Sequence, residues 1–139
     1  MALHVYTGRL PNERARIRGY RGEDAIDVAA GPRAAFDGAL SPSRDLNDDC
    51  NKRKRAARGD EQRLRMVWSW YEPLFVEEMR RSWLNCNGVW KGLLARTGEI
   101  TLCCYCATAH RCHRRLLAAI LVTAGQRLGV EVIDCGERP

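Results

Sequence analysis

The stretch Glu99-Ile-Thr-Leu-Cys-Cys-Tyr105 decides the fold of this chain. It holds β-branched and aromatic residues with a single charge, which is typical of a buried strand. Beyond the small residues at 107–109, an apolar run at helical spacing covers 116–124, and Val130-Glu-Val-Ile-Asp134 predicts another strand. A strand, a helix and a second strand of these lengths form a βαβ unit, whose strands are parallel in nearly all known cases.

Two shorter strands and a helical middle precede this unit. Residues 3–7 and 25–30 are short apolar runs closed by glycine, and both predict strands. Residues 60–94 hold all four tryptophans and predict helices. Because proline lacks an amide hydrogen, we expect the first helix to stop at Pro73, a second to begin there, and a third to cover 89–94.

The length and composition limit the class of protein. A chain of 139 residues has the size of one ordinary domain. We therefore expect a single α/β domain over 1–139, with a small, mostly parallel sheet of about four strands flanked by helices. No stretch approaches the roughly 18 consecutive apolar residues of a membrane span, and the first residues lack the features of a signal peptide. These observations predict a cytoplasmic protein without membrane contact, whose cysteines are reduced.

The segment 31–59 shows no reliable periodicity, so we expect it to be irregular. Its last part, 51–59, is a basic run without a large apolar residue, and it predicts a mobile basic loop. Such a run can bind nucleic-acid phosphates, or it can be a solvated surface that keeps the protein soluble. Both interpretations remain open from the sequence.

The turn after the cysteine-bearing strand concentrates reactive side chains. Four of the seven cysteines lie between 103 and 112. Strand side chains alternate between faces, so Cys104 and Cys106 point one way while Cys103 and Tyr105 point the other. Ligands of parallel sheets bind at the carboxyl ends of the strands, and the start of the next helix favours an anion or a thiolate.

Three interpretations of this turn remain open. In the first, Cys106 or Cys112 is a catalytic thiol, activated by the helix terminus and by His110 or His113. In the second, cysteine and histidine ligands hold a tetrahedral zinc ion, although their spacing differs from the usual paired C-x2-C units. In the third, the cysteines are ordinary small core residues. The candidate zinc ligands are Cys104, Cys106, Cys112 and His113.

Acidic and basic residues complete the candidate site. Asp27 is a carboxylate within an apolar strand, where burial is costly unless the group is paired or faces a pocket. It could orient a histidine, accept a substrate hydroxyl or pair with Arg114, and a structural salt bridge explains it equally well. An arginine near the helix start can hold a phosphate or carboxylate in its guanidinium fork. The candidate substrate-binding residues are Arg114, Arg111, Glu23 and Tyr105.

The segment Thr101-Leu-Cys-Cys-Tyr-Cys106, followed by Cys112-His-Arg114, resembles the strand-turn-helix signature of domain-of-unknown-function family 488, in particular its short branch in phages and bacteria. The segments at 5–7, 20–28 and 41–43 support the resemblance. It implies a compact α/β domain without a settled activity. By the same likeness a shared pocket would contain Cys104, Cys106, Cys112, His113, Arg114, Glu23 and Asp27.

The leading hypothesis is an enzyme that acts on a nucleotide, a nucleic acid or another anionic substrate through Cys106 or Cys112, with His113 as acid or base and Arg114 as anion holder. The alternative is a non-catalytic module that binds nucleic acid or a protein, with the cysteines as a zinc-binding staple or as core. A catalytic site requires a perturbed, accessible thiol, whereas a staple requires stoichiometric zinc. The oligomeric state and the partner do not follow from the sequence.

Overall fold

Four strands form one sheet in the computed structural model, which describes residues 2–9, 24–32, 34–106 and 112–138. The strands are β1 (Leu3–Arg9), β2 (Ala25–Asp27), β3 (Gly98–Cys104) and β4 (Val132–Glu137). They lie in the order β2-β3-β1-β4, and every neighbouring pair is parallel. The prediction of a single α/β domain with a small, mostly parallel sheet flanked by helices is confirmed.

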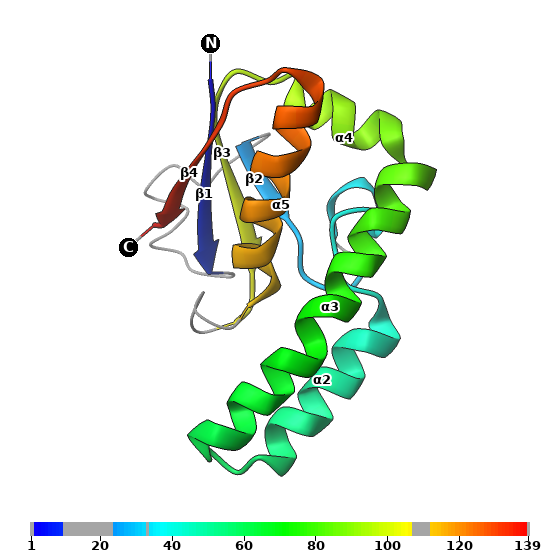
Figure 1. The fold of residues 1–139 in the computed structure, drawn as a ribbon, viewed down its shortest axis with the longest axis vertical. Coiled ribbons are helices and arrows are strands. Elements are labelled where there is room, and N and C mark those ends of the chain that lie inside the picture. The colour runs from blue at the N-terminus through cyan, green and yellow to red at the C-terminus, as the bar shows by residue number, and fades with distance from the viewer. Residues whose placement is uncertain (1, 10–23, 33, 107–111, 139) are drawn as a thin grey trace.

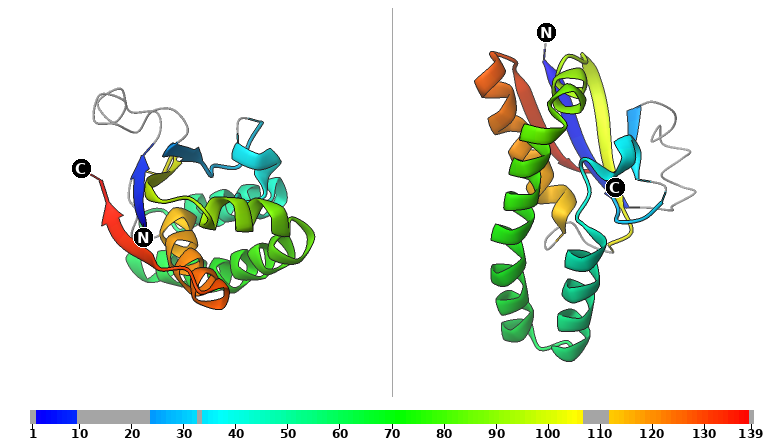
Figure 2. Two further views of the ribbon diagram at one scale, coloured as in Figure 1. Left: turned by 90° about the horizontal axis from the view of Figure 1, so that it is seen from above. Right: turned by 90° about the vertical axis from the view of Figure 1, so that its right-hand side faces the viewer.

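One face of the sheet carries the apolar core. Leu3 and Val5 of β1 are fully buried, and so is Leu102 of β3, because alternate side chains of these strands point toward the helices. Helix α5 (His113–Leu128) covers this face with Leu117, which is also fully buried. Figure 2 shows that the helices gather on this one side of the sheet. The predicted helix between the cysteine-bearing strand and the last strand therefore exists, and it supplies the cover that the sheet needs.

Helix α3 (Glu61–Asn85) is continuous, and α4 (Asn87–Leu94) follows it. The expected break at Pro73 is wrong, because this proline lies inside α3. Pro73 is exposed, as is Ser69 one turn earlier, so water can reach the carbonyl that lacks a helical partner. The buried Tyr71 and Phe75 on the opposite face hold the helix together across the proline.

A further helix, α2 (Arg44–Ala56), occupies much of the segment that we expected to be irregular. The prediction of an irregular segment over 31–59 is therefore wrong for 44–56, and most of the expected basic loop at 51–59 belongs to this helix. The hydroxyl of Ser43 accepts a hydrogen bond from the Leu46 amide at 3.2 Å and caps the helix. Leu46 and Cys50 form a narrow buried stripe, too short to show as a periodic pattern in the sequence.

Helices α2 and α3 form an antiparallel hairpin that extends well beyond the sheet (Figure 1). The hairpin projects on the side where the parallel strands end at their carboxyl termini, as Figures 1 and 2 show. This is the side on which ligands of parallel sheets bind. Among the helices of the described residues, none is sufficiently long and apolar to cross a membrane.

Candidate functional site

The candidate site lies between the end of β3 and the start of α5. Cys104 is the last residue of β3, and Cys106 follows it on the same side of the chain. Cys112 precedes α5 in an extended conformation, with φ −135° and ψ 144°, and His113 begins the helix. The strand and the helix thus bring together residues that are separated by a turn in the sequence.

Three thiols and one imidazole form a compact group, which we call the cysteine cluster. Its members are Cys104, Cys106, Cys112 and His113. Their donor atoms all lie within 4.8 Å of one another, and the Sγ atoms of Cys104 and Cys112 are 2.8 Å apart. Cys106 is half-buried, whereas the other three are buried. The structure therefore brings together four residues that the sequence nominated, and it leaves Cys106 as the most accessible of them.

The imidazole of His113 has a defined orientation. Its Nε2 lies 2.6 Å from the carbonyl oxygen of Val28, so Nε2 carries the hydrogen and donates it. Nδ1 is then the unprotonated nitrogen, 3.7 Å from the sulfur of Cys112. The ring packs against Phe75 of α3 at 5.6 Å between ring centres. Burial lowers the pKa of His113, so the neutral form predominates and presents a lone pair to the cluster.

Arg114 is a buried cation beside the sulfurs, with 1% of its surface exposed. Its Nε and Nη2 each donate to a carboxylate oxygen of Glu137 at 3.2 Å. Its Nη1 donates to the sulfur of Cys104 and to the carbonyl oxygen of Cys106, both at 2.9 Å. All three nitrogens therefore contact protein groups, and the cation stabilises negative charge on the cluster directly.

The thiols of the cluster differ strongly in acidity. Hydrogen bonds from Cys104 and Cys112 lower the pKa of Cys106, and the positive charge of Lys54 lowers it further. Hydrogen bonds with Cys104 and then with Cys106 raise the pKa of Cys112, and burial adds to the effect. The directions of these shifts make Cys106 the most acidic thiol of the cluster and favour a negative charge there over one on Cys104 or Cys112.

Residues of the hairpin also reach the cluster, and sequence reasoning missed them. Lys54 of α2 is close enough to affect the pKa of both Cys106 and Cys50. Tyr71 of α3 is buried, and its pKa is raised by burial and then by Cys50, Cys112 and Cys106. Cys50 and Lys54 are four residues apart, a spacing that places both on one helix face. If the sequence had predicted α2, this spacing would have indicated that Cys50 and Lys54 lie together on one face of it.

Asp27 is the last residue of β2, the strand that pairs with β3. It pairs in register with Cys103, so the two side chains share the face opposite Cys104. Burial and then the charge of Asp27 raise the pKa of Cys103 to about 12. Asp27 accepts a hydrogen bond from the Ala29 amide at 3.0 Å and, with Tyr105, lines a small hollow of about 220 Å³. The structure thus brings Asp27 to Tyr105 rather than to the cysteine cluster, and Arg114 pairs with Glu137 instead.

Three candidates, Glu23, His110 and Arg111, lie outside the described residues. Tyr105 is 52% exposed at the mouth of the Asp27 hollow, a position open to a bound molecule. The structure therefore describes both sides of the turn without the segment 107–111 between them.

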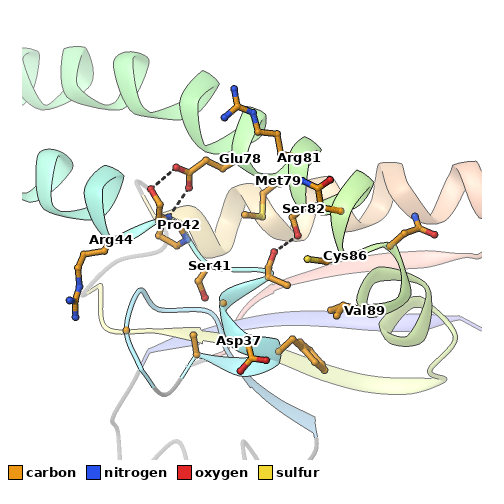
Figure 3. Close-up of a pocket in the computed structure, with 18 of the residues that line it drawn as sticks. Asp37, Ser41, Pro42, Arg44, Glu78, Met79, Arg81, Ser82, Cys86 and Val89 are labelled. Carbon is orange, nitrogen blue, oxygen red and sulfur yellow. Dashed lines mark hydrogen bonds between the residues drawn. The ribbon is translucent and has the colours of Figure 1, made fainter.

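A larger groove of about 930 Å³ lies between the segment 31–44 and the end of α3 (Figure 3). Glu78 closes one side, where its carboxylate accepts hydrogen bonds from the amide and hydroxyl of Ser43. Ser82 donates to the carbonyl of Ala39, which ties the segment to α3. The hydroxyl of Ser41 is buried here without a partner among the described residues. The groove shares residues 31, 32 and 34 with the Asp27 hollow, so the two are neighbours.

Comparison with family models gives a match over residues 9–125 to DUF488-N3a, described as the active DUF488-N3 subclade. The chain belongs to the DUF488 family. The match includes the end of β3 and the start of α5, which carry the cysteine cluster, so the sequence resemblance on these residues is confirmed. Comparisons with curated proteins and with solved structures gave no match. For this DUF488 protein, the chemistry must therefore be argued from the site itself.

Proposed function

We propose that this protein is an enzyme that acts on an anionic substrate, such as a nucleotide or nucleic acid, through the thiolate of Cys106. The observation that carries the proposal is the cluster geometry: three thiols lie within 4.8 Å of one another beside the cation of Arg114, and Cys106 is the half-buried one. Hydrogen bonds from Cys104 and Cys112 lower the pKa of Cys106 and favour its thiolate. A thiolate, rather than a thiol, is the nucleophile in cysteine chemistry. The description of the matched subclade as active agrees with an enzyme.

Each residue has a role in this proposal. The Cys106 thiolate would displace a leaving group from an electrophilic atom of the substrate, so that the bond to sulfur forms as the bond to the leaving group breaks and that group departs with its electron pair. Cys104 and Cys112 would hold the thiolate by hydrogen bonds, and Arg114 would balance the negative charge. His113 remains a candidate acid or base, with its unprotonated Nδ1 facing the cluster 3.7 Å from the sulfur of Cys112. Perturbed acidity at a strand-to-helix turn of a parallel sheet favours such a role over simple core packing.

The substrate contacts would come from the other side of the turn. Tyr105 and Asp27 line the adjacent hollow and remain candidates for substrate binding and for accepting a substrate hydroxyl. Glu23 and Arg111 remain candidates by sequence position alone. Arg114, by contrast, would act through Cys106, because its donors already contact Glu137 and the cluster.

The test measures the reaction of Cys106 with iodoacetamide as a function of pH. The protein would carry Cys86→Ser and Cys135→Ser, because these cysteines are the other half-buried ones among the described residues. We expect rapid labelling of Cys106 that persists down to about pH 6, well below the range of an ordinary thiol with a pKa near 8.5. Replacing Cys104 or Cys112 with serine should shift the profile of Cys106 upward. A profile with an ordinary midpoint would refute the thiolate proposal.

A zinc site is the second candidate, and the orientation of His113 favours it. Histidine ligands of metals donate their second ring nitrogen to a carbonyl or carboxylate, as Nε2 does here to Val28. Three sulfurs and Nδ1 are a ligand set that suits zinc. Zinc–sulfur bonds of about 2.3 Å place sulfurs roughly 3.8 Å apart, so Cys104 and Cys112 would have to separate from their present 2.8 Å.

Metal analysis of the purified protein separates the two candidates. A zinc centre predicts one zinc per chain, lost in Cys106→Ser and kept in the control Cys135→Ser, with slow labelling of Cys106 until a chelator is added. A free thiolate predicts no stoichiometric zinc and labelling that a chelator does not change. If neither zinc nor a shifted labelling profile appears, the cysteines are part of the core.

A further inference from the structure

The end of the α2–α3 hairpin carries most of the net charge of this protein. We call residues 50–65 the basic arm. They contain seven lysines and arginines and two acids, so they account for five of the six net positive charges of the chain. Within the described residues, only Arg65 of these cations forms an ion pair, with Glu61 at 3.8 Å. The basic residues of the arm are Lys52, Arg53, Lys54, Arg55, Arg58, Arg63 and Arg65.

Favourable interactions with the helix dipole explain only some of the positive charges of the arm. Cations at the carboxyl end of α2 interact favourably with the helix dipole. Arg63, in contrast, lies in the first turn of α3, where the dipole disfavours a positive charge. Arg63 also lies in a segment that contains six other cations, and exposed like charges repel one another. The arm therefore keeps positive charges where they oppose folding.

The turn between the two helices has a second unfavourable feature. Arg58 has a φ of +48°, in the left-handed region that favours glycine or asparagine. The next residue, Gly59, also has a positive φ. An arginine at this position adds charge to the tip at a cost in backbone energy. Two independent costs at one place indicate that the charge serves a ligand rather than the fold.

The arm leads toward the cysteine cluster. It projects on the side of the carboxyl ends of the strands (Figure 1), and Lys54 on its inner part affects Cys106 electrostatically. The guanidinium of Arg53 lies 4.0 Å from the ring centre of Trp70, which is half-buried. A row of cations with a partly exposed aromatic ring is the combination that holds the phosphates and bases of a single strand.

We propose that the basic arm binds single-stranded nucleic acid and guides it to the turn that carries Cys106. The proposal names the substrate class of the site described under the proposed function, and its last step rests on that function. A single strand fits better than a duplex, because Cys106 is half-buried and a base within a duplex is not accessible to such a group. Several phosphates along one strand would neutralise the cations of the arm that form no ion pair among the described residues.

The first test is fluorescence anisotropy with labelled single-stranded DNA and RNA of about 20 nucleotides, a length that spans several binding sites of this type. If four phosphates are contacted, the slope of log K against log salt should be about −3, so a fourfold rise in salt weakens binding on the order of 50-fold. Duplex DNA and polyphosphate of equal charge serve as competitors. Tighter binding to either one than to the single strand would overturn the proposal.

Matched triple variants locate the binding surface. The arm variant combines Arg55→Gln, Arg58→Asn and Arg63→Gln, which remove charge and preserve helix and turn conformations. The control variant, Arg80→Gln, Lys91→Gln and Arg127→Gln, removes the same charge from exposed positions outside the arm. The arm variant should lose at least tenfold in affinity and about 2 in salt slope, while the control keeps both. Equal losses in the two variants would show nonspecific attraction and contradict the proposal.

A cross-linking experiment separates this proposal from the enzyme proposal. A single strand that carries an internal bromoacetamide should form a covalent adduct with Cys106 in the Cys86→Ser, Cys135→Ser background, and the arm variant should lose the adduct. Anisotropy of Cys106→Ser should be unchanged. Binding through the arm without an adduct would contradict the guiding step alone, whereas an ordinary pH profile of Cys106 labelling would contradict only the thiolate.

Discussion

The cysteine cluster and the basic arm differ in how far their charges are paired with other groups of the protein. In the cluster, the buried cation Arg114 is matched by Glu137 and by the sulfurs, so every donor has an acceptor within the protein. In the arm, Lys52, Arg55 and Arg58 are exposed and have no ion pair among the described residues. The charge of Arg114 is therefore balanced by other protein groups, whereas these charges of the arm are not balanced by ion pairs among the described residues. The difference agrees with the two proposals, a reactive thiolate in the cluster and a polyanion bound by the arm.

Removal of the central cation should have the largest effect on stability. Arg114→Met leaves Glu137 and a buried negative cluster without their partner, so we expect the free energy of unfolding to fall by about 3 kcal/mol or more. The control is Arg115→Met, the adjacent residue, whose pair with Asp134 is half-exposed at 3.3 Å. An exposed pair contributes about 1 kcal/mol at most. Urea denaturation of both variants measures the contrast, and equal effects would contradict the internal charge balance.

Protonation of His113 at acid pH should lower the stability of the folded protein. Burial lowers the pKa of His113 in the folded protein, so the unfolded chain takes up a proton first as the pH falls. The stability that depends on neutral His113 is therefore present above the unfolded pKa of about 6.5 and is lost as the pH decreases below it. His113→Gln should flatten the loss between about pH 6.5 and 5, measured by urea denaturation, with His4→Gln as control. An unchanged slope in His113→Gln would refute this assignment.

The smallest effect should come from the arm, and it should have the opposite sign. Arg58→Asn places a residue that tolerates positive φ at the hairpin turn and removes one repelling charge, so stability should rise by about 0.5 to 1 kcal/mol. Arg55→Gln removes a repelling charge but also a favourable interaction with the dipole of α2, so stability should change less than in Arg58→Asn. Thermal unfolding at low and high salt measures both, since screening should reduce the part due to repulsion. A loss of stability in Arg58→Asn would contradict the view that the turn is strained.

The strands and α5 were predictable because their sequence patterns are local and strong. The apolar run at 99–105 and the helical spacing after it define a βαβ unit without further information. The convergence of Cys104 and Cys106 followed from the alternation of strand side chains. These parts of the site could be inferred because two residues apart on a strand always share a face.

The hairpin was less predictable, because its helices depend on tertiary contacts. Helix α2 buries only Leu46 and Cys50, and α3 continues through Pro73 since Tyr71 and Phe75 are anchored in the core. The role of Arg114 was also beyond the sequence, because Glu137 reaches it from β4, at the far end of the chain. A partner 23 residues away in the sequence leaves no local pattern.

The position of β1 has a consequence for how this protein forms during synthesis. Leu3 pairs with Gly98 on one side and with Val132 on the other, so both neighbours of β1 are synthesised long after it. Contacts of such long sequence separation form late. The hairpin α2–α3 has local contacts and can assemble earlier on the ribosome, while β1 waits as an unpaired apolar segment. Such a segment is a site for chaperone binding, so the nascent chain should depend on chaperones until β3 has emerged.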